Sequence, residues 1–288
     1  SCRVWRRYAK ALEAAGDAGA EAAFARAYAL APADPAVLAG LLRTQGRALG
    51  VVKLATLLAP VVREALARYE RKLEVGVVRA PDHFQAGWLR LLLATEPAEC
   101  VEPRGDFLRG VLAARRANEI ADVMAELPSC GAARQQEETD LWLNVLRLVR
   151  WTRFPEIRDN AGFVPTASAQ QIPAGPVVLV AGESGALSAA QAQEWSPLLR
   201  GALGQFTGTV IGCGTAGVAQ LAASETGRSA GRTRFLRYAE EGGSAPQAWV
   251  QVWTDLLAAG IEPKAVTLLG LGGDAAAAFA YRLAVVLG

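Results

Sequence analysis

The chain has 288 residues, of which 52% are hydrophobic and 20% are charged, and its formal net charge at pH 7 is +2. This composition is typical of a globular protein with a sizeable core and excludes an intrinsically disordered chain. A charge so close to neutral gives no strong field of one sign, so we expect no nucleic acid among the partners.

The cysteines and the histidine argue against a metal centre. The four cysteines stand far apart without a Cys-x-x-Cys pair, and His83 is the single histidine. A zinc site of the usual kind would need an unusual ligand set, so we expect no metal. A catalytic triad would have to use His83, which lies in a predicted helical region far from the glycine-rich part, and a structural histidine is the favoured interpretation. Scattered free cysteines are typical of the reducing cytosol, which predicts a cytoplasmic protein.

We expect neither a secretory signal at the start of the chain nor a membrane span within it. The arginine-rich start leads into an Ala/Glu-rich amphipathic stretch, which is not a secretory signal. Charges such as Lys53 and Arg63 interrupt the apolar stretches, so we expect no membrane span in this chain. The chain starts at Ser1 without methionine and stops after an apolar helix. We therefore expect it to be a piece of a longer protein.

Residues 1–151 are predicted to form a helical domain. Alanine, leucine, arginine and glutamate dominate, and apolar residues recur at spacings of three and four. After a first pair of helices, the periodicity predicts further helices over 36–47, 50–74, 82–95, 105–127 and 134–151.

The first helical pair has a recognisable order of residues. Two apolar faces flank the Gly16-Asp17 turn, and they are formed by Trp5, Tyr8 and Leu12 and by Ala20, Phe24 and Ala27. This order, which Pro32 closes, resembles a tetratricopeptide repeat. The resemblance implies a helical-repeat surface that docks a peptide, a protein partner or a second copy of the chain. The alternative is a helical domain that packs against its neighbour and has no ligand of its own.

Residues 152–171 are predicted to be a linker, because four prolines interrupt any regular period between Arg153 and Pro176. The second domain then covers residues 172–288. Short apolar runs predict strands at 176–181, 208–211 and 265–269, and each run leads through glycines into a predicted helix. Ser188 is a suitable N-cap for the helix that ends near Leu203. The order of strand, glycine loop and helix occurs three times and predicts a Rossmann-like α/β domain with an open, mainly parallel sheet.

The glycine loops predict an anionic ligand. Glycines let backbone N–H groups approach phosphate oxygens, and the helix that follows adds the positive end of its dipole. In an open sheet such loops gather at the carboxyl ends of the strands, where ligands bind. The candidate ligand-binding residues are Gly182, Ser184, Gly185, Gly212, Gly214, Thr215, Gly217, Gly272 and Gly273. Thr215 would donate its hydroxyl and its backbone N–H to a phosphate or a ribose.

One element of a nicotinamide-binding domain is missing. The Gly-x-Gly-x-x-Gly pattern that ends at Gly217 follows the second strand rather than the first, and Glu225 comes only eight residues later. An NAD-dependent redox enzyme is therefore disfavoured.

A set of segments in the C-terminal part resembles the SLOG superfamily, in a prokaryotic form akin to the cytosolic N-terminal module of melastatin-type TRP channels. These segments are the strand Val177–Val180 with Gly182, then Phe206–Gly217, Trp253–Pro263, and Val266–Asp274 running into Phe279–Leu283. The resemblance covers the C-terminal part of the chain alone. It implies a Rossmann-like sensor of nucleotides or nucleotide-derived signals that is often fused to effector domains. It also implies that the chain continues into another strand after the last helix.

The sequence departs from this family at several places. Cys213 stands where many relatives have glycine, and the third loop lacks the threonine and glutamate of the related phosphoribohydrolases. Asp274 and Glu183 are the acids that could act if the chain were a nucleotide N-glycosidic hydrolase, although an N-cap is the more ordinary role for Asp274. Three interpretations stay open: a sensor that binds without turnover and needs no cofactor, a ligand-free structural or assembly protein, and the hydrolase.

An arginine-rich stretch follows the second glycine loop. It contains Arg228, Arg232, Arg234 and Arg237, and we predict a loop that folds over the pocket and presents Arg232 and Arg234 to phosphates. The alternative is a set of solvated arginines.

Overall fold

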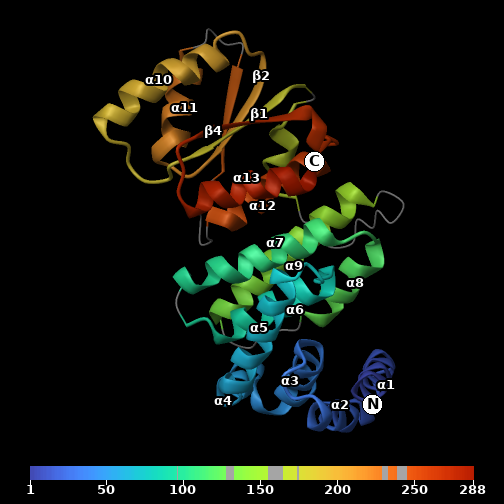
Figure 1. The fold of residues 1–288 in the computed structure, drawn as a ribbon. Helices are drawn as coiled ribbons and strands as arrows, with labels where there is room; N and C mark the ends of the chain where they lie inside the picture. Colours follow the sequence, from blue (N-terminus) through green and yellow to red (C-terminus); the bar gives the residue numbers. More distant parts are fainter. Residues whose placement is uncertain (96, 128–132, 155–164, 174, 229–232, 239–244) are drawn as a thin grey trace. The chain divides into compact units, whose positions relative to one another are not determined.

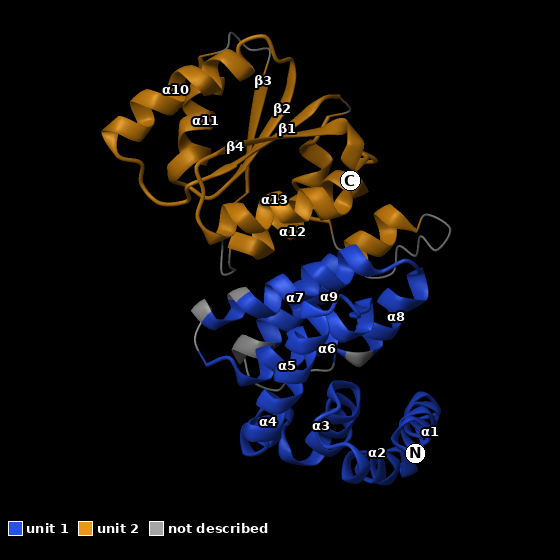
Figure 2. Ribbon diagram, in the orientation of Figure 1, with its two compact units in different colours: residues 1–146 blue, residues 147–288 orange. Residues whose placement is uncertain are grey.

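The computed structural model describes residues 1–95, 97–127, 133–154, 165–173, 175–228, 233–238 and 245–288 (Figure 1). The chain forms two compact units, Ser1–Leu146 and Arg147–Gly288, and the division falls within helix α9 (Figure 2). The first unit is helical, and the second combines helices with a sheet.

The helical unit is built from consecutive helices joined by short turns. Its helices are α1 (Cys2–Ala14), α2 (Gly19–Leu30), α3 (Pro35–Leu49), α4 (Val51–Leu57), α5 (Ala59–Glu74), α6 (Ala80–Leu93), α7 (Val101–Ala113), α8 (Ala117–Glu126) and α9 (Ala133–Arg153), with a 3₁₀ turn at Pro97–Cys100. Close packing uses small residues: a Cβ atom on Gly40 of α3 would lie 2.0 Å from the Phe24 ring of α2. A stack of Phe107 on Trp142, with ring centroids 4.9 Å apart, joins α7 to α9.

Two of the helices predicted from the sequence are wrong in length. The predicted helix 50–74 is divided at Leu58, because Pro60 lies in the first turn of α5 and has no N–H to donate to the preceding turn. The predicted helix 105–127 ends at Ala113. The carboxylate of Glu119 accepts hydrogen bonds from the backbone N–H groups of Arg115 and Arg116, at 2.7 and 3.2 Å, and starts α8.

A buried polar network stands inside the helical unit and contains the single histidine. Asp106 is fully buried and accepts hydrogen bonds from Tyr69 Oη at 2.8 Å and from Arg109 at 2.6 Å. Arg90 Nε lies 3.1 Å from the same carboxylate, and His83 Nδ1 lies 2.8 Å from Tyr69 Oη. Burial and the hydrogen bond to Asp106 raise the pKa of Tyr69 to about 12, and burial lowers the pKa of His83. His83 therefore belongs to the helical core.

The second unit contains a four-stranded parallel sheet with the strand order β3-β2-β1-β4. Its strands are β1 (Val177–Gly182), β2 (Gly208–Cys213), β3 (Thr233–Tyr238) and β4 (Val266–Leu271), and its helices are α10 (Ala189–Leu203), α11 (Gly217–Gly227), α12 (Ala245–Ala258) and α13 (Ala275–Leu287). Alternate β1 residues, Val178 and Val180, pack in a core with Leu199, Leu203 and Val218 of α10 and α11. Helices α12 and α13 pack on each other beside the sheet (Figure 1).

Strand β3 corrects the sequence-based prediction, which placed residues 228–237 in a loop. Thr233–Tyr238 is an edge strand that pairs in parallel with β2. Leu236 and Tyr238 are buried while Arg234 and Arg237 are exposed, and those two charges interrupt the apolar run by which the other strands were predicted. The other three strands and the helices that begin after Ser188 and Asp274 confirm the prediction.

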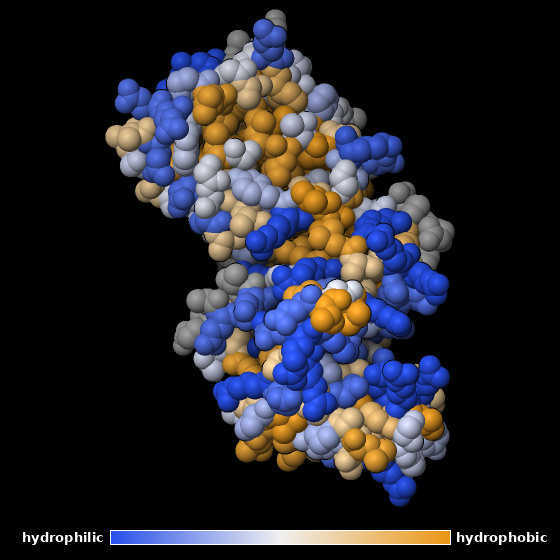
Figure 3. All heavy atoms as spheres, viewed as in Figure 1, coloured by the Kyte–Doolittle hydropathy of each residue, from blue (hydrophilic) through white to orange (hydrophobic). Residues whose placement is uncertain are grey.

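The opposite edge of the sheet has a different surface. Strand β4 has no charged residue, and its apolar side chains on both faces are half-buried: Val266, Leu268, Leu269 and Leu271. Figure 3 shows orange apolar surface over the sheet region of the C-terminal unit. Across the residues that the structure describes, no helix combines the length and the apolar character that a membrane crossing requires.

Candidate functional site at the carboxyl edge of the sheet

The strand order reverses direction between β1 and β4. The chain passes from β1 to β2 and β3 on one side and then returns to β4 on the other side of β1. The connections on the two sides therefore diverge, and ligands of open α/β sheets bind at such a point, beyond the carboxyl ends of the strands. The loops after β1, β2 and β4 all start at this edge, because the strands are parallel.

A side-chain contact holds the first and third loops together. Ser184 donates hydrogen bonds to Asp274 Oδ2 from its hydroxyl and, at 3.2 Å, from its backbone N–H. The other oxygen of Asp274 caps α13 by accepting from the N–H groups of Ala276 and Ala277, each at 2.9 Å. Burial raises the pKa of Asp274, but the hydrogen bonds from Ser184 and the α13 backbone outweigh it and leave the pKa below its ordinary value. Asp274 is thus an ionised cap rather than a proton donor.

The first and second loops meet at the N-terminus of α11. The carbonyl oxygen of Glu183 accepts from Val218 N at 2.9 Å, and a Cβ on Gly217 would lie 1.9 Å from that oxygen. Gly214 N donates to the carbonyl of Tyr238 at 2.9 Å. One backbone donor of the Gly-x-Gly-x-x-Gly segment, Gly214, and that of Val218 directly after it are therefore used within the protein, while Thr215 remains exposed at the tip of the segment.

The predicted glycines fall into two groups. A Cβ would collide with the backbone or with packed side chains at Gly182 (2.3 Å from Leu271 O), at Gly217 and at Gly272 (2.7 Å from the Trp195 ring), and it would be tightly packed at Gly212 (3.1 Å from Ala219 Cβ). Close packing within the fold accounts for glycine at these four positions, although Gly272 is also exposed. The predicted residues that are exposed at this edge are Ser184, Gly185, Thr215, Gly272 and Gly273, and Gly214 is half-buried.

Two aromatic residues at this edge were not predicted as site residues. Tyr281 of α13 donates to the carbonyls of Ala181 and Gly272, at 3.1 and 3.0 Å. A Cβ on Gly272 would lie 2.7 Å from the ring of Trp195 on α10. Gly270, in the interior of β4, was the available signal, because a glycine there marks a close approach, here of Tyr281 Oη.

Arg234 does not lie over the loops as predicted. Arg234 lies at the amino end of β3, opposite Thr209, and donates to the carbonyl and the side-chain oxygen of Gln171, at 3.0 and 3.2 Å. It is therefore at the far edge of the sheet from the glycine loops. Arg237 donates to Gln220 of α11 at 2.6 Å. Arg232 lies outside the described residues.

The contacts of Glu225 indicate that this residue stabilises the fold. Its carboxylate is buried and accepts from Arg200 Nε at 2.9 Å and Ser196 Oγ at 2.6 Å, and it pairs with Arg228. The hydrogen bond from Arg200, with Ser196 and the charge of Arg228, outweighs the effect of burial and lowers the pKa of Glu225 to about 2. These contacts join α10 to α11.

Within the described parts of the chain, no three His, Cys, Asp or Glu side chains gather as they would around a metal ion. Comparison of the chain with protein-family models, curated proteins and solved structures found no match. The candidate site therefore rests on its own geometry.

Proposed function

We propose that the C-terminal unit is a Rossmann-like domain that binds a nucleotide or a nucleotide-derived signal at the carboxyl edge of its sheet. The observation that carries this proposal is the arrangement of three loops at one edge, with the Ser184–Asp274 contact joining the loops that follow β1 and β4. The resemblance to the SLOG superfamily supports the same proposal.

The surface groups at this edge are suited to phosphate or ribose oxygens. Ser184 and Thr215 carry exposed hydroxyls, and Gly185, Gly272 and Gly273 leave the backbone accessible. Helix α11 also begins here and adds the positive end of its dipole, whereas the first N–H groups of α13 already donate to Asp274.

We infer binding without turnover. An acid that cleaves an N-glycosidic bond must release a proton, and Asp274 is held ionised by four hydrogen bonds. In this proposal the helical unit acts as an interaction domain. Ligand binding to the C-terminal unit then changes the conformation or the assembly of the protein parts that are attached to that unit.

The test uses the full chain and a panel of nucleoside mono-, di- and triphosphates and dinucleotides. Thermal unfolding is recorded with each ligand, and chromatography then measures whether the ligand is intact. The proposal expects a raised midpoint with an intact ligand, and a smaller rise in a Thr215→Val variant. A released base would show the hydrolase instead, and no shift with any ligand would favour the ligand-free interpretation.

A further inference from the structure

Helix α12 carries a buried carboxylate, Asp255, that lies outside the site proposed above. The residue has no exposed surface, and among the described residues no cation pairs with it. A buried charge is costly unless hydrogen bonds compensate for its lost hydration. The groups that donate to Asp255 therefore decide whether the carboxylate can stay in the core.

Four donor groups surround this carboxylate, and all four are uncharged. Its Oδ1 accepts from Thr166 N at 2.8 Å and from Gln251 Nε2 at 2.9 Å. Its Oδ2 accepts from the hydroxyl of Thr166 and from Tyr238 Oη at 2.7 Å. Burial, and then the hydrogen bond to Asp255, raise the pKa of Tyr238, so the phenol keeps its proton and remains a donor.

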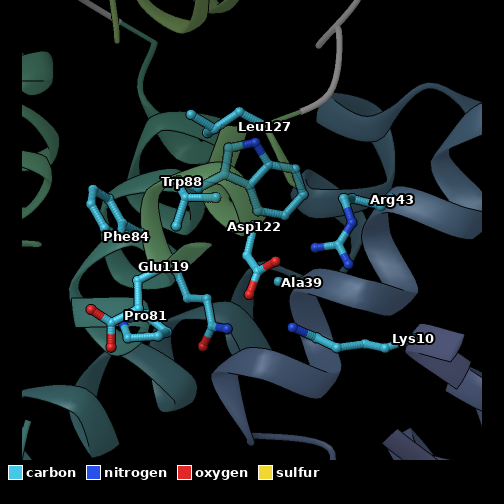
Figure 4. A pocket seen from close by; sticks show the side chains of 11 residues that line it. Lys10, Ala39, Arg43, Pro81, Phe84, Trp88, Glu119, Asp122 and Leu127 are labelled. Atoms are coloured by element: carbon cyan, nitrogen blue, oxygen red, sulfur yellow. The ribbon is translucent and has the colours of Figure 1, made fainter. Parts of the chain in front are cut away.

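A buried charge in the helical unit is compensated in a different way. The pocket in Figure 4 is lined by residues of α1, α3, α6 and α8 and has a volume of about 50 Å³. Its buried guanidinium, Arg43, pairs directly with the carboxylate of Glu13 at 2.9 Å. Asp255 depends instead on neutral donors from α12, β3 and the segment 165–173. Loss of any one of them leaves a buried carboxylate with too few hydrogen bonds.

The donors on Thr166 come from the segment that precedes the sheet. Thr166 is exposed and belongs to residues 165–173, which stand between α9 and β1 in the chain. Near the end of this segment, the carbonyl of Gln171 accepts from Arg234 of β3 at 3.0 Å. The segment is thus attached to the α/β unit at two places, and the contact with Asp255 is the buried one.

The donor on Tyr238 leads to the glycine loop at the sheet edge. Tyr238 is the last residue of β3 and is paired with Cys213, the last residue of β2. The carbonyl oxygen of Tyr238 accepts from Gly214 N at 2.9 Å, while its hydroxyl donates to Asp255. Tyr238 therefore contacts the Gly-x-Gly-x-x-Gly segment through its backbone and Asp255 through its side chain.

We propose that Asp255 is a positioning residue that couples the glycine loop after β2 to the segment 165–173. Its Oδ2 accepts one hydrogen bond from each side, so a carboxylate that loses one hydroxyl must shift to recover a donor and disturbs the other contact. The coupling is reciprocal, because it is a free energy shared by the two contacts. Its use as the output of a nucleotide sensor rests on the function proposed above, whereas the coupling itself does not.

The experiment measures amide hydrogen exchange of the ¹⁵N-labelled full chain by NMR, with no nucleotide present. The amide of Thr166 reports on the segment, because it donates to Asp255, and that of Gly214 reports on the loop, because it donates to Tyr238. Thr166→Val is expected to speed exchange at Gly214 at least fivefold. Tyr238→Phe is expected to do the same at Thr166. The amide of Leu179, in the central strand β1, should stay within twofold of its native rate.

Two matched controls lie in the same segment. Thr166→Ser keeps a hydroxyl and is expected to retain the native exchange rate at Gly214. Ser168→Ala removes a neighbouring hydroxyl that is not bonded to Asp255, and it is expected to have no effect there.

Three outcomes overturn the proposal. The first is an exchange rate at Gly214 that stays within twofold of native in Thr166→Val, and the second is an equal increase in Thr166→Ser. The third is an increase at Leu179 as large as that at Gly214, because it would show a loss of global stability rather than coupling. None of these readouts uses a nucleotide, so failure of the coupling is distinct from failure of the proposed function.

Discussion

The two units place their polar chemistry in different ways. The helical unit has a buried carboxylate, Asp106, in its core and surrounds it with Arg90, Arg109 and Tyr69. The α/β unit places its predicted polar groups at the ends of strands, where glycines bring backbones together. The comparison teaches that a charged cluster can be a stabilising element while a set of small residues forms the candidate binding edge.

The largest expected effect is on the helical network. Asp106→Asn removes the charge that two arginines share, and we expect the free energy of unfolding of the helical unit to fall by about 3 kcal/mol. Urea denaturation followed by circular dichroism measures this. Asp140→Asn, at an exposed position on α9, is the control. A loss below about 1 kcal/mol would show that the network contributes little to stability.

The next effect tests whether close packing explains the glycines. Gly217→Ala places a Cβ 1.9 Å from Glu183 O at a residue with φ +60°, and we expect a loss of about 2 kcal/mol in the α/β unit. Gly185→Ala is the matched control, because the nearest atom there is 3.7 Å away, and its expected loss is below about 0.5 kcal/mol. Similar losses for both variants would contradict the division into two groups of glycines.

Much of the second unit could be predicted from the sequence. Three strands are continuous apolar runs, and Ser188 and Asp274 stand where helix caps are required. Strand β3 could not be found in this way, because two of its six residues, Arg234 and Arg237, are exposed arginines that interrupt the apolar pattern. In the helical unit, the break before α8 depends on one carboxylate, that of Glu119, which a periodic pattern does not reveal.

The candidate site was predictable in position and less so in composition. The glycine pattern indicates that backbones approach closely, but the same pattern results from a nearby ligand and from a neighbouring carbonyl. Gly217 illustrates this, since its neighbour is Glu183 O. Tyr281 and Trp195 each contact a segment that is distant in sequence, Ala181 for Tyr281 and Gly272 for Trp195, so a local pattern does not show which residues they meet.

A smaller effect concerns Glu225 and depends on pH. The pKa of Glu225 is about 2 in the folded chain, against about 4.3 in an unfolded one. Because the folded pKa is the lower one, ionised Glu225 stabilises the folded chain, and this contribution to the free energy of unfolding is complete above the unfolded pKa. That contribution is lost as the pH falls toward 2. We expect Glu225→Gln to cost about 1–2 kcal/mol at pH 7 and nothing near pH 2, with exposed Glu194→Gln as the control. A difference that does not change between pH 7 and pH 2 would contradict this account.

The smallest expected effect on stability is at the candidate site itself. Ser184 is exposed, so Ser184→Ala should cost less than about 0.5 kcal/mol by thermal unfolding. A loss above about 2 kcal/mol would show that the Ser184–Asp274 contact is a structural element, like the helical network, rather than part of an adaptable binding edge.

The central claim is that the carboxyl edge of the sheet binds a nucleotide-type anion. Its most direct test is a titration of the ¹⁵N-labelled full chain with the nucleotide that gives the largest thermal shift, recorded as amide NMR spectra. The account predicts that the amide signals of Ser184, Thr215 and Gly272 move together and saturate, while those of Asp106 and its network stay in place. Unchanged signals at the sheet edge throughout the titration, or movement confined to the helical unit, would contradict it.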